Sequence, residues 1–172
     1  MKKLLTVTAL AFISTALFAQ TKWNLDNTHS SVNFTVTHLV ISEVDGTFKK
    51  FTGNVSAPNA DFTDATVDFS VDINSINTDN EMRDNHLKSD DFFNAAQYPN
   101  MTFKSTSFKK VSGNKYQLKG NLTIRDVTKP ITFDVTYGGT VKDPWGNIKA
   151  GFKATGTINR FDYNLKWNNM TE

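Results

Sequence analysis

TVDFSVDI, residues 66–73, is the stretch of sequence that decides the fold. Its apolar side chains alternate strictly with Thr, Asp and Ser, and they are Val67, Phe69, Val71 and Ile73. A period of two puts one set of side chains on a buried face and the other in water. The stretch therefore predicts a β-strand that is buried on one face only.

The same alternation recurs over most of the remaining chain. It is found in residues 32–38, 101–103, 118–124, 131–137 and 148–158. Thr, Val and Phe dominate these runs, and these residues suit pleated, half-buried strands. Turn sequences separate them, namely SGN at 112–114, GG at 138–139 and DPWG at 143–146. Short strands joined by such turns predict an all-β sandwich or barrel, and the pattern alone leaves both open.

Residues 80–89 break the alternation and are expected to form a short helix. Thr78 and Glu81 stand three residues apart, as the two ends of a capping box do. We expect this helix to bridge two strands and to cover one mouth of a barrel. The chain shows neither an internal repeat nor a linker, so residues 20–172 are predicted to form one domain.

Residues 1–19 have the pattern of a signal peptide. Lys2 and Lys3 precede an uncharged apolar stretch, and Ala19 is a small residue at the expected cleavage position. The stretch falls short of the roughly 20 apolar residues that span a membrane, so no stable membrane anchor is expected. We therefore expect a protein that is periplasmic or secreted.

The composition of residues 20–172 excludes several classes of partner and site. Once residues 1–19 are removed, 17 basic residues balance 17 acidic ones, so the basic excess of a nucleic-acid-binding protein is missing. The chain has no cysteine, which excludes disulfides and thiolate metal sites. Its three histidines share no metal-ligand spacing. Neither a metal nor a cofactor is predicted.

Two groups of polar residues are candidates for a chemical role. His38 falls on the apolar face of its strand, where a core histidine with a hydrogen bond and a contact to a ligand head group are both open. Arg83, Asp84 and His86 crowd into the predicted helix, where they form either an acid–base site or a hydrogen-bonded clamp. We favour the clamp, and we predict that the protein is not an enzyme.

Four blocks of sequence resemble the YceI-like polyisoprenoid-binding family. The first combines NTHS at 27–30 with the alternating run at 32–38 and GTF at 46–48; the second is RDNHLKSDDFF at 83–93 with YP at 98–99. GNLTI at 120–124 with VTKP at 127–130 is similar to a third block, and INRFDY at 158–163 to a fourth. The blocks follow the family's order and extend over residues 23–167.

The resemblance implies a lipocalin-like antiparallel barrel of about eight strands that encloses a long isoprenoid, either polyprenyl or quinone-like. It also implies a role in carriage, storage or stress response, without catalysis. The alternation selects the inward face, so the candidate lining residues are Val32, Phe34, Val36, His38, Val67, Phe69, Phe103, Leu122, Phe133 and Phe152.

Members of this family continue past the fourth block into a final strand, whereas this sequence ends at Glu172. We therefore expect the last strand to be missing and the barrel to be left with unpaired edges. Such edges favour pairing with another chain, and a homodimer is one expected partner. The alternatives to a lipid carrier are a secreted structural or interaction domain with a fully packed core, and an enzyme that acts on a hydrophobic substrate.

Overall fold

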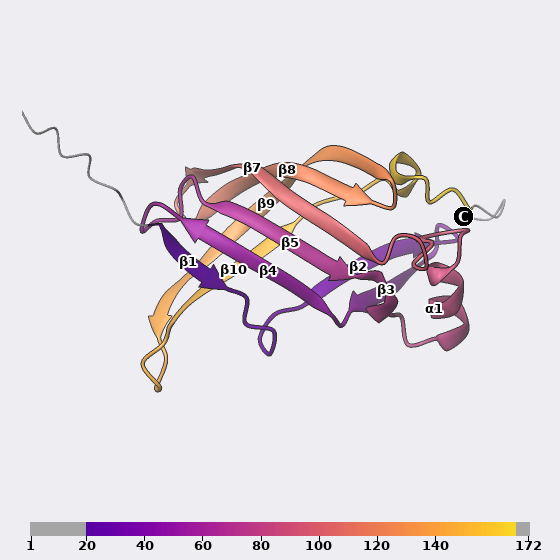
Figure 1. The fold of residues 1–172 in the computed structure, drawn as a ribbon, viewed down its shortest axis with the longest axis horizontal. Helices are drawn as coiled ribbons and strands as arrows, with labels where there is room; N and C mark the ends of the chain where they lie inside the picture. The colour runs from indigo at the N-terminus through magenta and orange to yellow at the C-terminus, as the bar shows by residue number, and fades with distance from the viewer. Residues whose placement is uncertain (1–19, 168–172) are drawn as a thin grey trace, which may run out of the picture.

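The computed structural model describes residues 20–167, and most of them lie in β-strands (Figure 1). In chain order the elements are β1 (Thr21–Asn24), β2 (Val32–His38), β3 (Ser42–Phe48), β4 (Phe51–Ala57), β5 (Thr66–Asp72), η1 (Ile73–Ser75), β6 (Ile76–Asn77), α1 (Glu81–Lys88), β7 (Asn100–Ser112), β8 (Lys115–Ile124), β9 (Val127–Lys142), β10 (Ile148–Thr155) and η2 (Arg160–Tyr163). The predicted all-β architecture with one short helix is confirmed. The predicted signal peptide, residues 1–19, lies outside the described residues.

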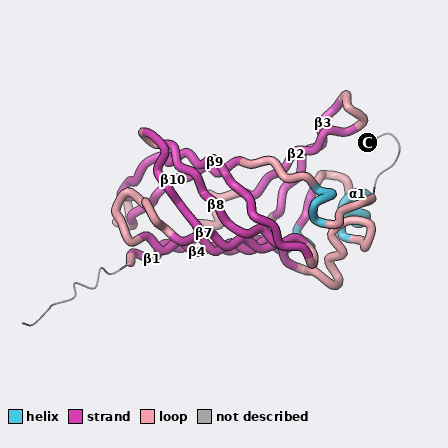
Figure 2. The backbone as a smooth tube through the Cα atoms, turned by 90° about the horizontal axis from the view of Figure 1, so that it is seen from above, coloured by secondary structure: helices cyan, strands magenta, loops and turns pink. Residues whose placement is uncertain are grey.

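Seven strands form one antiparallel sheet in the order β1-β4-β5-β7-β8-β9-β10, and three form a second sheet in the order β2-β3-β6. The chain passes from β3 into β4 after two residues, and from β5 through η1 into β6, so the two sheets share continuous segments. The large sheet curls into a half-barrel (Figures 1 and 2). Within residues 20–167, β10 pairs only with β9, which leaves an open side that we call the seam, between β10 and β2.

The core lies on the inner face of the curled sheet. In β8 every second residue is buried and the intervening residues face outward, as a strand with one wet face requires. The buried residues form two clusters. One includes Phe62, Phe108 and Tyr116, and the other, which packs against Leu87 of α1, includes Phe48 and Ile73. Figure 1 shows α1 at one end of the half-barrel, opposite the β9–β10 turn.

The turns predicted at 112–114 and 143–146 are confirmed, because they join β7 to β8 and β9 to β10. The turn predicted at Gly138 and Gly139 is wrong, since both residues lie inside β9. Gly151 pairs with Gly139 while Phe152 pairs with Tyr137, so Gly138 is an extra residue in a β-bulge. The bulge requires a glycine because the φ of Gly139 is +111°, a backbone conformation that residues with a Cβ rarely adopt.

The predicted capping box is also wrong. The N-cap of α1 is Asn80, whose side-chain oxygen accepts a hydrogen bond from the Arg83 N–H at 3.0 Å. Thr78 lies two residues further out, and its hydroxyl donates to Asp84 instead, at 2.6 Å. The helix therefore uses the common Asn cap, and the threonine is left to fix the chain that enters the helix.

Candidate functional site

The half-barrel surrounds a cavity of about 2800 Å³ that is open along the seam and reaches from the first cluster to α1. This exceeds the roughly 300–1,000 Å³ of a usual small-molecule pocket. Strands of both sheets line it, and Phe, Val and Leu side chains make up much of the wall. The space therefore suits a long apolar molecule rather than a compact polar one.

All ten candidate residues from the sequence line this cavity: Val32, Phe34, Val36, His38, Val67, Phe69, Phe103, Leu122, Phe133 and Phe152. They differ in depth. Phe103 and Leu122 are buried in the floor, whereas Val36 and Phe152 remain 46% and 41% exposed because they stand on β2 and β10, beside the seam. Whether these residues contact a ligand stays a prediction.

Phe51 and Phe62 are among the lining residues that sequence reasoning missed. Phe51 begins the alternation of β4, which continues with Val55 and Ala57, but Gly53 interrupts the apolar pattern. Phe62 lies in the loop between β4 and β5, where no periodicity applies, yet it is only 2% exposed. Only the first of these two residues had a signal in the sequence.

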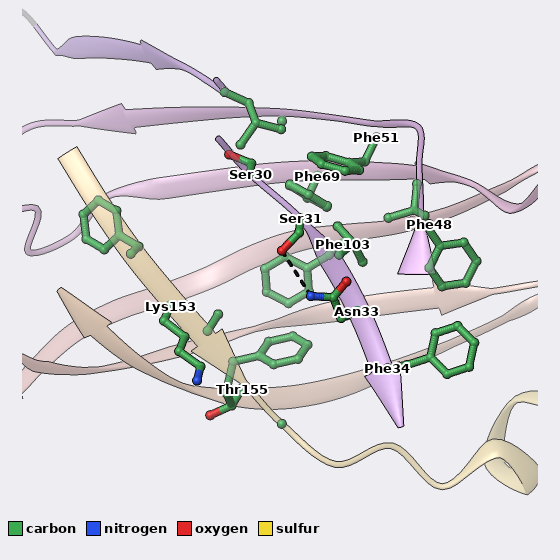
Figure 3. A pocket seen from close by; sticks show the side chains of 18 of the residues that line it. Ser30, Ser31, Asn33, Phe34, Phe48, Phe51, Phe69, Phe103, Lys153 and Thr155 are labelled. Atoms are coloured by element: carbon green, nitrogen blue, oxygen red, sulfur yellow. Dashed lines mark hydrogen bonds between the residues drawn. The ribbon is translucent and has the colours of Figure 1, made fainter. Parts of the chain in front are cut away.

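Phenylalanine rings form a band across the middle of the cavity floor (Figure 3). Phe51 stacks on Phe69 with ring centroids 5.9 Å apart, and Phe69 pairs with Phe103 in the β5–β7 ladder. Phe103 meets Phe133 edge-on at 5.5 Å. We call these four residues the phenylalanine band.

The seam carries polar side chains, in contrast to the floor. Ser31 directly precedes β2 and Asn33 is its second residue, and the Asn33 amide donates to the Ser31 hydroxyl at 3.1 Å. Lys153 and Thr155 come from β10, and all four residues line the cavity (Figure 3). The cavity therefore has an apolar floor and a polar opening.

Arg83 and Asp84 hold α1 to Thr78, which lies in the segment between β6 and the helix. Thr78 donates to the Asp84 carboxyl from its N–H at 2.9 Å and from its hydroxyl at 2.6 Å. Arg83 donates from Nε to the Thr78 hydroxyl and from Nη2 to the Thr78 carbonyl, both at 2.7 Å. Asp84 is buried, and His86 contacts the exposed Asp91 at 3.0 Å. This is the geometry of the clamp.

Aromatic rings complete the α1 end of the cavity. Trp167 meets His86 edge-on at 4.9 Å and Phe92 at 5.5 Å, which ties the segment after η2 to the helix. Arg160 donates to the Trp167 carbonyl at 2.7 Å, and its guanidinium lies 5.8 Å from the centre of the Phe92 ring. These contacts place helix and C-terminal segment together across one mouth.

An ion pair crosses the seam at the other end. Lys149 of β10 lies 2.9 Å from the carboxylate of Asp26, which belongs to the loop between β1 and β2. Hydrogen bonds from Thr28, and then from Lys149 and His29, hold the pKa of Asp26 far below its ordinary value of 3.8. The Asp26 hydrogen bond raises the pKa of Lys149. The folded state therefore favours the charged form of both groups.

Asp26→Asn is expected to lower the urea midpoint of unfolding at pH 7, and the difference from the parent should shrink in acid. The pKa of Asp26 is lower in the folded state, so its contribution is complete above the unfolded value near 3.8 and is lost as pH falls toward the folded value. Urea unfolding between pH 7 and pH 2.5 measures the difference. Equal midpoints at pH 7 would show that the pair contributes nothing.

Among residues 20–167, no group of three or more His, Cys, Asp or Glu side chains lies close enough together to hold a metal ion. Within the same residues, no helix has the length and apolar character needed to cross a membrane.

Comparison with known proteins finds one family. The family model described as a YceI-like domain matches residues 23–172. A curated relative, protein YceI of Salmonella newport, is 39% identical over 161 residues, which cover 93% of this chain and 84% of the relative.

Solved structures agree with the fold. The crystal structure of the Campylobacter jejuni YceI protein is 38% identical, covers 82% of each chain and gives a TM-score of 0.67. A polyisoprenoid-binding domain from Saccharophagus degradans covers 69% of this chain and 68% of its own, with 20% identity and a TM-score of 0.51. At that identity the last likeness shows the fold alone.

Proposed function

Since this chain belongs to the YceI-like family, we propose that it is a lipid-binding protein that holds a long isoprenoid chain, polyprenyl or quinone-like, in its cavity. The observation that carries the proposal is the cavity of about 2800 Å³ with its phenylalanine floor. The Saccharophagus domain, which shares the fold, is described as polyisoprenoid-binding. A flexible apolar chain is the ligand that gains most from a long wall of this composition.

The expected binding energy follows from the apolar surface that the ligand would bury. About 400 Å² of prenyl chain at ~25 cal/mol/Å² gives on the order of 10 kcal/mol before the costs of association are subtracted. The polar seam lets a head group remain hydrated while the chain is buried, as the Lys153 and Thr155 side chains border the opening. The proposed role is carriage or storage, or a response to stress, without catalysis.

The alternatives make different demands on the same structure. A structural or interaction domain with a fully packed core requires that no cavity exist, and the large cavity speaks against it. An enzyme that uses Arg83, Asp84 and His86 requires side chains available for chemistry, whereas Arg83 and Asp84 bind Thr78. Lipid binding is the function that fits both observations.

Two further parts of the proposal concern the cellular compartment and the oligomeric state. We propose that residues 1–19 direct export, so that the protein acts in the periplasm or outside the cell. The homodimer also stays a proposal. Within residues 20–167, the outer edge of β10 pairs with no strand, and it is the surface on which a second copy would pair.

Mass spectrometry of a solvent extract from the purified protein tests the function. We expect one isoprenoid lipid per chain, and we expect delipidated protein to bind added solanesol. Ala154→Trp fills the cavity beside the seam and should reduce the bound lipid, whereas Val111→Trp, at a 66% exposed position, should not. An empty extract together with no uptake of solanesol by folded protein would refute the proposal.

A further inference from the structure

Four phenylalanine rings that line the cavity lie directly over glycines of neighbouring segments. The pairs are Phe34 over Gly46, Phe69 over Gly53, Phe103 over Gly120, and Phe133 over Gly156. Phe34 and Phe69 face their glycines directly across a β-ladder, at the β2–β3 and β4–β5 pairs. One arrangement therefore recurs in four places on the cavity wall.

The distances show that each glycine is required by its ring. A Cβ added at Gly53 would lie 2.6 Å from Cδ2 of Phe69, and one added at Gly156 would lie 2.6 Å from Cδ1 of Phe133. At Gly46 the distance to Cζ of Phe34 would be 2.2 Å. Real Cβ atoms do not approach other carbons this closely, so any larger residue forces the ring to move. Gly53 and Phe69 lie on the same cavity-facing side of the sheet, so a Cβ at Gly53 displaces the ring away from the sheet and into the cavity.

The position of these rings gives them a role in binding. Phe69 packs against both core clusters, so it stands at the middle of the cavity, between its two ends. Phe69 and Phe103 face each other in the β5–β7 ladder and belong to the phenylalanine band (Figure 3). A chain that occupies both ends must pass over this band.

We propose that the glycine–phenylalanine pairs are specificity determinants, which hold the rings flat so that the middle of the cavity stays open and a long chain can span both ends. This inference rests on the proposed function and deepens it. Displacing one ring into the cavity divides it into two parts. The affinity for a long chain then falls, while a short chain still fits within one end. The ligand selected in this way is a single long chain.

The test compares the affinities of solanesol, a long prenol, and farnesol, a short one, for four proteins. Gly53→Ala should weaken solanesol binding about tenfold, as the loss of contact with about two methylene groups would, and should leave farnesol nearly unchanged. Gly151→Ala is the matched control, because Gly151 lines the same cavity and a Cβ there meets nothing within 4 Å. Adding Phe69→Leu to Gly53→Ala should restore solanesol binding, because the smaller side chain leaves room for the Cβ.

The outcomes separate this inference from the function on which it rests. Equal solanesol affinities for Gly53→Ala and Gly151→Ala overturn the inference, and so does a loss for both prenols that Phe69→Leu does not restore. Failure of the parent protein to bind either prenol refutes the lipid-binding function itself. If Gly53→Ala does not fold, the same comparison is made with Gly156→Ala and Phe133→Leu, since Gly156 lies after β10 at an exposed position.

Discussion

Asp84→Ala is expected to lower the free energy of unfolding by about 3 kcal/mol, because it removes the acceptor of two buried hydrogen bonds. Asp84 is 8% exposed, and both the N–H and the hydroxyl of Thr78 donate to it. Thr78 is itself only 5% exposed, so its N–H and hydroxyl cannot form hydrogen bonds to water once the carboxylate is removed. Urea unfolding of the two proteins measures the difference.

Two variants make this result specific. Asp84→Asn keeps one oxygen acceptor and should cost about 1 kcal/mol, less than the alanine variant. Asp91→Ala removes an exposed carboxylate, 51% accessible and paired with His86, and should cost less than about 1 kcal/mol. If Asp84→Ala instead unfolds like the parent protein, Asp84 is not the clamp, and an acid–base role regains support.

The sequence predicted the strands that carry an unbroken apolar alternation. β2, β5 and the inner row of β8 were found because every second residue is apolar or nearly so. β3 of the small sheet and β4 of the curled sheet were not predicted as strands, although residues of both line the cavity. In both strands a glycine takes an inward position, Gly46 in β3 and Gly53 in β4, and the apolar pattern loses its middle member.

The neighbouring strands explain why β3 and β4 lack an apolar side chain at these inward positions. Gly46 and Gly53 leave space that Phe34 and Phe69 fill from across the ladder, so the inward face remains apolar although the residue itself has no side chain. A pattern read along one strand does not contain that information. The same limit applies to the clamp. The spacing of Thr78 and Glu81 suggested a capping box, whereas in the structure the Thr78 hydroxyl donates to Asp84 and Asn80 caps the helix.

Phe62→Ala is expected to cost about 4 kcal/mol, within the range measured for removal of a buried aromatic ring. Phe62 is 2% exposed and packs its ring against Trp23 at 5.2 Å, Tyr137 at 5.5 Å and Phe152 at 4.9 Å. These partners come from β1, β9 and β10, so this one loop residue joins the two edges of the large sheet. Trp145→Ala, at an 85% exposed position, should change stability by less than about 0.5 kcal/mol.

The backbone at Phe62 supplies an internal check on this prediction. Its φ is +63°, in the left-handed region that costs an L-residue about 1 kcal/mol and costs glycine almost nothing. Phe62→Gly should therefore be about 1 kcal/mol more stable than Phe62→Ala, although it removes one more carbon. Thermal or urea unfolding of both variants decides it. A glycine variant less stable than the alanine variant would mean that the loop changes conformation once the ring is lost, and that the ring, rather than the turn, sets the path of the chain between β4 and β5.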